Sequence, residues 1–504
     1  MTAIRTGCSG FLATLHAEWT KFRTVRGWVL TMAGALLATI VVGLLGTAAP
    51  GPGGRGADAS YPKGPGGEAV NDSFFFVYRT LTGDGALTVS LRSLTGVADT
   101  GTGKTARGVQ PWAKAGIIVK ESLAQGSPYA ALVATGAHGV RMQYDYTHDT
   151  AGPGAPQGWL RLVRSGDRLT GYASADGSRW TEVGRARLPG LARTVRAGLF
   201  ATSPQAKQGT GAGAGFVPAV ATGTFGRPAL TGGWSRTPWR GTQVGGDAGT
   251  SGSYTNTLKG GFTRAGDGFT VTGAGDIAPV VGGPVMGVGF SVEDFLVGTF
   301  AGLIAVIAVA TVFITGEYRQ GLLRTTMTAT PVRGRVLGAK ALVAGGVACA
   351  VGLVAAAVVL PLGASGARGR GFLVLPVTSA TEVRVVVGTG LLCAAVAVFA
   401  LGVGALLRRS GTAVALVVAS LVLPFLLAAS GALPAGVSEW LLRVTPAAGF
   451  AVQQTLPRYA QVLSVYEPST GYFPLAPWAG LAVLYGYAAL AHGLAVVRLR
   501  GRDV

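Results

Sequence analysis

The sequence predicts an α-helical membrane protein with six transmembrane helices and an all-β domain inserted between the first two of them. Only 13% of the 504 residues are charged and 49% are hydrophobic, and the apolar residues gather in runs too long for the helices of a globular core. Residues 50–293 differ, because short stretches of alternating polar and apolar residues there are separated by turn-forming residues.

Six apolar runs are long enough to cross a hydrocarbon core of about 30 Å at a rise of about 1.5 Å per residue. We expect transmembrane helices at residues 28–49, 294–315, 338–362, 385–407, 411–433 and 476–497. The first run is longer than the core of a signal peptide, which spans about 7–15 residues, so we expect it to be a retained anchor. The pair Gly298 and Gly302 would let two helices approach closely.

The orientation follows from lysine and arginine, which are retained in cytoplasmic segments. They concentrate in residues 1–27, in residues 316–337, at Arg408 and Arg409, and in the tail 498–504. We therefore expect both termini in the cytoplasm and residues 50–293 outside the cell membrane of a bacterium. The net charge of +20 then divides between the two sides of the membrane. Its cytoplasmic part is the usual signature of a membrane protein that faces anionic lipid, and no nucleic-acid partner is predicted.

One stretch resembles a nucleotide-binding loop. Ala98 is followed by four residues and then by Gly103, Lys104 and Thr105, a near match to the loop that holds phosphates. Such a loop joins a strand to a helix, whose N-terminus meets the anion, whereas here a proline and a strand-like run follow. We interpret the stretch as a hairpin loop.

The rest of the chain offers little for catalysis. His138 and His148 lack the spacing of metal ligands, and no nucleophile elbow is present. Cysteine is absent from residues 50–293, so we expect no disulfide there. No catalytic, cofactor-binding or metal site is predicted in this chain.

The outer segment reads as an antiparallel β-sandwich. Residues 50–67 form a Pro/Gly linker, residues 68–228 carry the alternating stretches, and residues 229–293 read as a Gly-rich β extension. In "VRMQYDY" the pattern places Val140, Met142, Tyr144 and Tyr146 on one face.

The stretches "WLRLVRSGDRLTGYASADGSRWTEVG" and "AGLFATS" resemble the concanavalin A-like sandwich attached to many bacterial glycan-active and surface proteins. The residues that carry this resemblance are Tyr172, Ser174, Asp176, Gly177 and Trp180. The resemblance implies the fold and little about activity.

Glycosidases use paired carboxylates, and no such cluster is found among Glu68, Glu121 and Glu182. Trp112, Trp159 and Tyr172 are candidate glycan contacts, with core packing of the same residues as the alternative.

Two polar segments flank the first two spans. Before the first span, one helical stripe contains Leu12, Leu15, Trp19, Phe22 and Arg26. This pattern predicts an interfacial amphipathic helix, whose candidate functional residues are Glu18, Trp19, Lys21 and Arg23. Residues 316–337 begin helically and break at Pro331, which predicts a compact cytoplasmic loop.

The segments "HAEWTKFRTVRGW" and "EYRQGLLRTTMTATPVRGRVLGAKAL" resemble permease subunits of ABC-2-type transporters of high-GC bacteria. The likeness extends to the last span and its tail. It implies a separate ATP-binding subunit that carries ATP and Mg, a second permease copy or homologue, and export. It also implies that the loop couples to the ATPase through Glu317, Tyr318, Arg319 and Arg324.

The chain departs from the short form of that family, because a whole domain replaces the first outer loop. This domain could capture cargo, bind the cell wall or receive a partner. The alternative function is a membrane-anchored glycan-binding sensor or adhesin, but a mere anchor needs only one span. Residues 434–475 are expected to form an outer loop with short helices.

Overall fold

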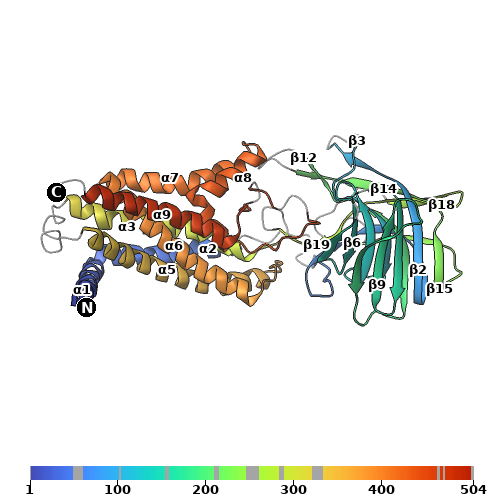
Figure 1. The fold of residues 1–504 in the computed structure, drawn as a ribbon, viewed down its shortest axis with the longest axis horizontal. Coiled ribbons are helices and arrows are strands. Elements are labelled where there is room, and N and C mark those ends of the chain that lie inside the picture. The colour runs from blue at the N-terminus through green and yellow to red at the C-terminus, as the bar shows by residue number, and fades with distance from the viewer. Residues whose placement is uncertain are drawn as a thin grey trace.

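A computed structural model describes residues 2–48, 61–100, 104–152, 154, 158–208, 215–245, 260–282, 289–319, 333–462, 466–468 and 471–500. The chain forms a helical domain and a β domain, which lie at opposite ends of the long axis (Figure 1). Both termini lie at the end of the helical domain remote from the β domain.

The helical domain contains six helices long and apolar enough to cross a membrane. These are α2 (Arg26–Ala48), α3 (Thr299–Arg319), α5 (Arg333–Gly369), α6 (Ser379–Leu407), α7 (Ser410–Ala429) and α9 (Pro477–Arg500). The shorter elements are α1 (Thr2–Thr24), η3 (Val292–Gly298), α8 (Ala435–Val444) and η4 (Pro446–Gln453). The six long helices coincide with the six predicted runs, which makes the chain a helical membrane-type protein with an inserted β domain.

The ends of these helices differ from the predicted limits. The run expected at 338–362 lies within the longer α5, and the run expected at 385–407 belongs to a helix that already begins at Ser379. The run expected to reach 433 ends at Ala429, and Gly431 then adopts a positive φ of 68°. Hydropathy marks the apolar middle of a helix, whereas its ends depend on caps and neighbouring segments.

Helix α6 lies at the centre of the helical domain, and 72% of its most apolar window is buried. It packs against α3, α5 and α9. Small residues make this possible: Gly402 lies against Ala491 of α9, Gly390 against Leu353 of α5, and Gly404 against Thr311 of α3. A central helix of this kind needs an apolar surface all round.

The contact between α2 and α3 also depends on glycine. A side chain at Gly298 would overlap the carbonyl oxygen of Thr39, and one at Gly302 would overlap the hydroxyl of the same residue. The pair singled out in the sequence therefore lies where a neighbouring backbone approaches closely.

In the β domain, the strands before the middle of the sequence are β1 (Val70–Asp72), β2 (Phe74–Asp99), β3 (Thr105–Arg107), β4 (Lys114–Lys120), β5 (Tyr129–Thr135), β6 (Val140–Tyr144), β7 (His148–Ala151), β8 (Gly158–Ser165) and β9 (Arg168–Ser174). The later strands are β10 (Thr181–Arg187), β11 (Thr194–Thr202), β12 (Ala206–Gln208), β13 (Gly215–Val217), β14 (Ala219–Phe225), β15 (Ala229–Trp234), β16 (Arg240–Val244), β17 (Gly261–Ala265), β18 (Gly268–Gly273) and β19 (Ile277–Pro279).

One antiparallel sheet runs in the order β10-β9-β8-β2-β11-β4-β5-β6-β7. It curls until β10 lies beside β6 and β7, so that the sheet is nearly closed. The long strand β2 holds it together, because its beginning pairs with β11 and β16, its middle pairs with β8 and β15, and its end pairs with β14. Residues 229–273 thus add strands β15 to β18 to this sheet, and the expected boundary at residue 228 lies within it.

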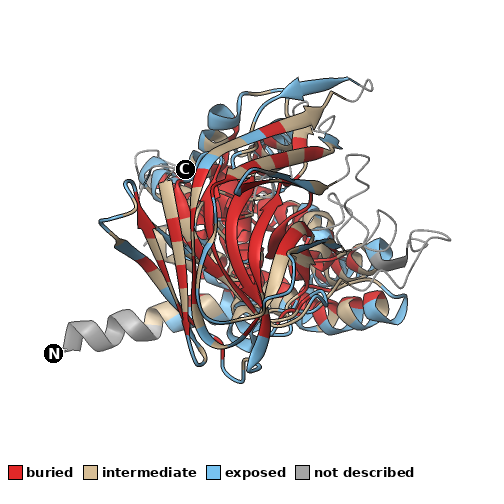
Figure 2. Cartoon of the chain, turned by 90° about the vertical axis from the view of Figure 1, so that its right-hand side faces the viewer, coloured by how far each residue is buried: buried red, intermediate tan, exposed pale blue. Residues whose placement is uncertain are grey.

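The sheet has apolar residues on both faces of its middle strands. The inner face carries the main core, which includes Leu81, Ile117, Leu132 and Leu199. The other face of the same strands carries a second core around Phe76. Figure 2 shows these strands buried and the rim of the domain exposed.

The alternation expected for "VRMQYDY" holds only as far as the strand. Val140 and Met142 belong to the main core and Tyr144 packs against it, but Tyr146 belongs to the second core. Asp145 and Tyr146 have positive φ values of 43° and 61°. This left-handed turn ends the period-two pattern and redirects the Tyr146 ring.

The stretch that resembles a nucleotide-binding loop leads into a strand. Thr105 begins β3, which pairs with the end of β2, and the amide of Thr100 donates to the carbonyl of Lys104 at 2.8 Å. Residues 101–103 lie outside the described residues. The described part matches the hairpin interpretation.

We predict that Gly302→Ala destabilises the helical domain, although alanine is a better helix former by about 1 kcal/mol. The new methyl group would overlap Thr39, and overpacking costs about 1–3 kcal/mol. Thermal unfolding in detergent measures the effect. The matched control is Gly316→Ala in the same helix, where a methyl group meets no atom; equal stability of the two variants contradicts the close contact.

Candidate functional site: two buried charge clusters

The first cluster lies at the end of the helical domain that carries the termini. Four charged side chains from α1, α3 and α5 meet there, and we call them the helix-end cluster: Glu18, Lys21, Glu317 and Lys340. The Lys340 ammonium donates to Glu18 Oε2 at 2.6 Å and to Glu317 Oε1 at 2.8 Å. Lys21 donates to Glu18 Oε1 at 2.9 Å and to Glu317 Oε1 at 3.1 Å.

The cluster is buried and electrically balanced. Lys340 is 0% and Glu18 is 1% exposed, while two ammonium groups face two carboxylates. Removing one partner of a buried ion pair leaves an uncompensated charge and costs about 3–5 kcal/mol. The four groups therefore hold α1, α3 and α5 in one arrangement.

Aromatic rings close the inner side of this cluster. The Lys340 ammonium lies 4.1 Å from the centroid of the Phe313 ring, a distance suited to a cation–π contact. Phe313 in turn meets Phe22 at 5.5 Å and Trp28 at 5.1 Å, both edge-on. The rings exclude water from the ion pairs and so strengthen them.

Lys21 is the member nearest to solvent, and its side chain is 40% exposed. Its burial alone would lower the pKa of the ammonium group, but the hydrogen bond and charge of Glu18, together with Glu317, outweigh this effect. The pKa of Lys21 is therefore raised, and the group stays charged across the physiological range.

Three of these four residues are predicted functional residues, but their common position is not evident from the sequence. The sequence places Glu18 and Lys21 on an interfacial helix and Glu317 in a coupling loop, whereas the structure pairs them with one another. Glu317 is 8% exposed, so little of it is available to a docking protein. Lys340 was missed, although a lysine inside the predicted span 338–362 is a signal in itself, because ionisable residues in spans require partners.

The stripe predicted for the first helix divides between two surroundings. Leu12 is 62% and Trp19 is 43% exposed, whereas Phe22 is buried and Leu15 packs against the helical core. The buried face of α1 also contains Thr14 and Glu18, and the helix packs against α5. The helix buries a carboxylate because Lys340 neutralises it.

The other predicted coupling residues surround the cluster. The Tyr318 ring lies 4.9 Å from the Arg408 guanidinium. Arg319, at the end of α3, and Arg23, near the end of α1, are exposed. Arg324 lies outside the described residues.

The second cluster joins the β domain to the helical domain. Strands β1 and β19 pair with each other, Asp72 opposite Ile277, and form a two-stranded ribbon. Along the chain, β1 follows α2 and β19 precedes α3. We call this ribbon the neck.

Two buried lysines hold the neck on the sheet. Lys114 and Lys120 begin and end β4 on the same face, and both are 0% exposed. Lys120 Nζ lies 2.7 Å from Asp72 Oδ2, and Lys114 Nζ lies 2.8 Å from Asp276 Oδ1. Lys114 also donates to the carbonyl of Ile277 at 2.6 Å. Each ion pair ties one strand of the neck to β4.

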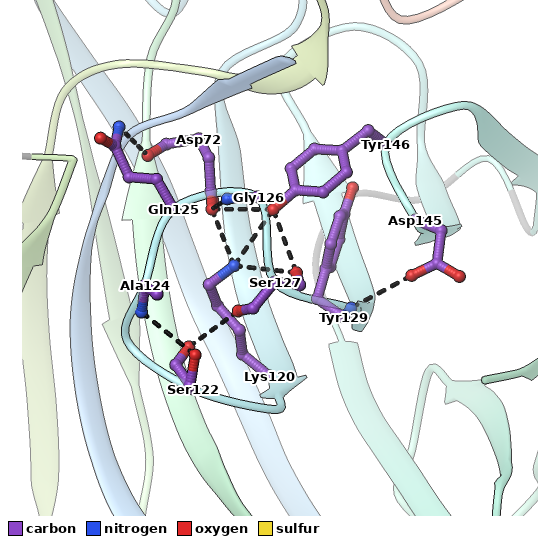
Figure 3. Close-up of polar contacts among 10 residues, drawn as sticks. All are labelled: Asp72, Lys120, Ser122, Ala124, Gln125, Gly126, Ser127, Tyr129, Asp145 and Tyr146. Carbon is purple, nitrogen blue, oxygen red and sulfur yellow. Dashed lines mark hydrogen bonds and ion pairs between the residues drawn. The ribbon is translucent and has the colours of Figure 1, made fainter. Parts of the chain in front are cut away.

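Tyr146 completes the contacts around Lys120, as Figure 3 shows. Its hydroxyl donates to Asp72 Oδ2 at 2.7 Å, and the amide of Gly126 donates to the same oxygen at 2.8 Å. Lys120 further donates to the carbonyl of Ser127 at 3.1 Å. The turn with positive φ values therefore places the Tyr146 hydroxyl where it donates to Asp72 Oδ2, while Asp72 Oδ1 is buried without a hydrogen-bond partner among the described residues.

Burial sets the protonation of this cluster. It lowers the pKa of Lys120 although the charge of Asp72 opposes the shift. Burial, followed by the charge of Asp72, raises the pKa of Tyr146 well above its usual value. Tyr146 thus remains a neutral donor.

The β domain also contacts two loops of the helical domain. Gln461, which is 2% exposed, donates through Nε2 to the carbonyl of Tyr146 at 2.8 Å, and Lys207 pairs with Glu467. Leu373, between α5 and α6, packs against Ala69 and Val280 beside the neck. The two domains therefore meet through a specific interface.

The three candidate glycan contacts have different surroundings. Trp112 is 2% exposed and stacks on His138 with ring centroids 4.1 Å apart. The ring is thus part of the packing, which is the alternative given for this residue. Trp159 is half-buried, and the Gly177 turn lies so close to its ring that a side chain at this glycine would overlap it. Tyr172 is half-buried in the middle of β9.

Comparisons with known proteins add little. No family model and no curated protein matches the sequence. A functionally unknown protein from Saccharomyces cerevisiae is similar in structure, with 16% identity and a TM-score of 0.22 over 34% of this chain and 81% of that chain. SCP-B, a member of the Eqolisin family of peptidases solved with the tripeptide Ala-Ile-His, is 11% identical with a TM-score of 0.25 over 42% of this chain and 100% of that chain. Neither similarity bears on the function.

We predict that Gln461→Ala loosens the interface between the two domains. The substitution leaves the Tyr146 carbonyl without its donor, and loss of a buried hydrogen bond costs about 1–2 kcal/mol, or about tenfold in local opening. Hydrogen exchange of the amides around Tyr146 measures this opening. Gln243→Ala, an exposed position on β16, serves as the control; equal exchange in both variants contradicts the role of Gln461.

Proposed function

We propose that this chain is the membrane-spanning permease subunit of an ABC-2-type transporter, acting in export and powered by a separate ATP-binding subunit. In this proposal the helix-end cluster faces the cytoplasm, the β domain lies outside the cell, and a second permease copy or homologue completes the channel. ATP and Mg belong to the partner subunit. The β domain is proposed to be a concanavalin A-like sandwich.

The observation that supports this proposal best is the helix-end cluster. It joins α1 to the end of α3 and the beginning of α5, the two helices that flank residues 320–332. A force applied to α1 or to this loop reaches both helices, because separating the four charges is costly. Such a link is what a permease needs if it is moved by another subunit.

The burial of Glu317 indicates which residues could contact the ATP-binding subunit and which could transmit movement. Exposed groups at the same end, Trp19, Arg23 and Arg319, are the side chains available to the ATP-binding subunit. Glu317, paired with Lys340, transmits movement between helices. Docking and transmission are therefore assigned to different residues.

The orientation is tested by thiol labelling in intact cells, in a background without native cysteines. Cysteine at Ser178, which is exposed on the β domain, is expected to react with an impermeant reagent. Cysteine at Ser410, which begins α7, is expected to remain unlabelled until the cells are opened. Labelling of position 410 alone reverses the proposed orientation.

The coupling role is tested with the ATP-binding subunit that copurifies with the chain. Glu317→Gln leaves one positive charge in excess in the cluster and is expected to keep the subunit bound while abolishing the permease-dependent increase in ATP hydrolysis. Arg319→Ala is expected to weaken copurification instead. The control is Glu382→Gln, an exposed carboxylate in the first turn of α6.

Full ATP hydrolysis by Glu317→Gln, at normal membrane levels, contradicts the transmission role. Absence of any copurifying ATP-binding subunit contradicts the transporter proposal itself and favours a membrane-anchored sensor or adhesin.

A further inference from the structure

A group of aromatic rings and arginines lies at one edge of the β domain. We call it the edge cluster, and its members are Phe75, Arg79, Trp234, Trp239, Phe262, Arg264 and Phe269. They come from β2, from the end of β15, from the residue before β16, and from the hairpin of β17 and β18. Strands β15 and β18 lie at the end of the molecule remote from the helices (Figure 1).

The rings of the edge cluster form a continuous series. The Phe75 and Phe262 centroids are 6.2 Å apart, those of Phe262 and Phe269 6.4 Å, those of Phe269 and Trp239 5.5 Å, and those of Trp239 and Trp234 6.4 Å. Phe269 is 2% exposed and forms the floor, whereas Phe262 is 37% exposed. Trp234 and Trp239 are half-buried.

Two glycines let two of these rings lie close to the backbone. A side chain at Gly241 would overlap the rings of Phe262 and Phe75, and one at Gly260 would overlap the Phe75 ring. Phe75 and Phe262 therefore lie directly on backbone, and we call the surface formed by the rings the shelf.

Two guanidinium groups lie on this shelf. Arg79 is 5.0 Å from the centroid of Trp239, and Arg264 is 5.7 Å from that of Phe269. Among the described residues neither forms an ion pair with a carboxylate. In addition, Arg79 Nε is buried without a hydrogen-bond partner in this part of the chain. An unused buried donor of this kind carries a desolvation cost that an added acceptor would remove.

Arg161 on β8 resembles these two arginines, because it lies 5.3 Å from the centroid of Trp180 and its Nε is buried without a hydrogen-bond partner among the described residues. Three other surface arginines behave differently. On β10 and beside it, Arg179 pairs with Asp176, Arg185 with Glu182 and Arg187 with Asp167. The positive charge of that surface is balanced within the domain, whereas the charge of the edge cluster is not.

We propose that the edge cluster binds an anionic polysaccharide, a sugar polymer that carries carboxylate or phosphate groups. The C–H face of a sugar ring packs on an exposed aromatic ring, and a guanidinium group binds carboxylate or phosphate with two parallel hydrogen bonds. The shelf offers both kinds of group side by side.

Two other classes of ligand suit the cluster less well. An acidic peptide such as polyglutamate would supply carboxylates to the arginines but no sugar face to pack on the exposed Phe262 ring. Strands β15 and β18 lie at the end of the molecule remote from the helices (Figure 1), and therefore away from the helices that a bilayer would surround. The proposal rests on the β domain alone and does not depend on the transporter function.

The test uses the full chain in nanodiscs of neutral phosphatidylcholine. Polygalacturonate and phosphorylated dextran are the anionic sugar probes, plain dextran is the neutral polymer, and polyglutamate carries charge without sugar. Biolayer interferometry is expected to show binding of one or both anionic sugar polymers, with polyglutamate and plain dextran bound at least about tenfold more weakly.

Two variants locate the site. Arg264→Gln and Phe262→Ser are expected to weaken binding of the anionic sugar polymer about tenfold each, because a cation–π or stacking contact contributes about that much. Arg185→Gln removes the same charge from the exposed surface of β10 and is expected to change nothing. Both Arg264 and Arg185 are exposed, so the charge comparison stands even if Phe262→Ser fails to fold.

Several outcomes would overturn the proposal. These are equal binding of polyglutamate, equal loss in Arg185→Gln and Arg264→Gln, or no binding of either anionic sugar polymer. Binding only when the nanodiscs contain anionic lipid would assign the cluster to a lipid surface instead.

Discussion

The structure depends on one constraint, namely that a charged group can be buried only beside its opposite. Lys114, Lys120 and Lys340 are each 0% exposed. Leaving any of them unpaired would cost several kcal/mol, on the order of the whole stability margin of a small domain. Each forms an ion pair with a carboxylate from another segment of the chain: Lys114 with Asp276, Lys120 with Asp72, and Lys340 with Glu317. These pairs fix which segments lie together.

The two clusters lie at the two ends of the same helices. The neck leads along the chain into α2 and α3, and α3 ends at the helix-end cluster with Glu317. Glycine-mediated contact keeps α2 and α3 close between these points. Packing between α2 and α3 thus links the helix-end cluster to the opposite ends of these helices, and Gln461 and Leu373 add contacts between the helical domain and the β domain.

On the surface of the β domain, some arginines pair with carboxylates and others do not. The arginines on β10 and beside it are balanced by carboxylates, whereas those of the edge cluster stack on rings. Balanced surface pairs contribute little to stability or recognition. An anionic ligand gains most binding free energy from guanidinium groups that lie on aromatic rings and have no carboxylate partner. For this reason we infer binding at the edge cluster rather than at Trp112, Trp159 or Tyr172.

The sequence by itself determined the properties that depend on neighbours along the chain. Six apolar runs predicted six long helices, alternation predicted strands, and the residues after Thr105 predicted a hairpin instead of a phosphate-binding helix. Tertiary structure alone decided which ionisable groups are paired and which rings are covered. From the sequence alone, Glu18 and Glu317 resemble surface residues, but in the structure both accept hydrogen bonds from Lys340. Trp112 is a candidate ligand contact in the sequence, but in the structure it stacks on His138. Pairing and covering depend on residues far apart in the sequence, which no local pattern brings together.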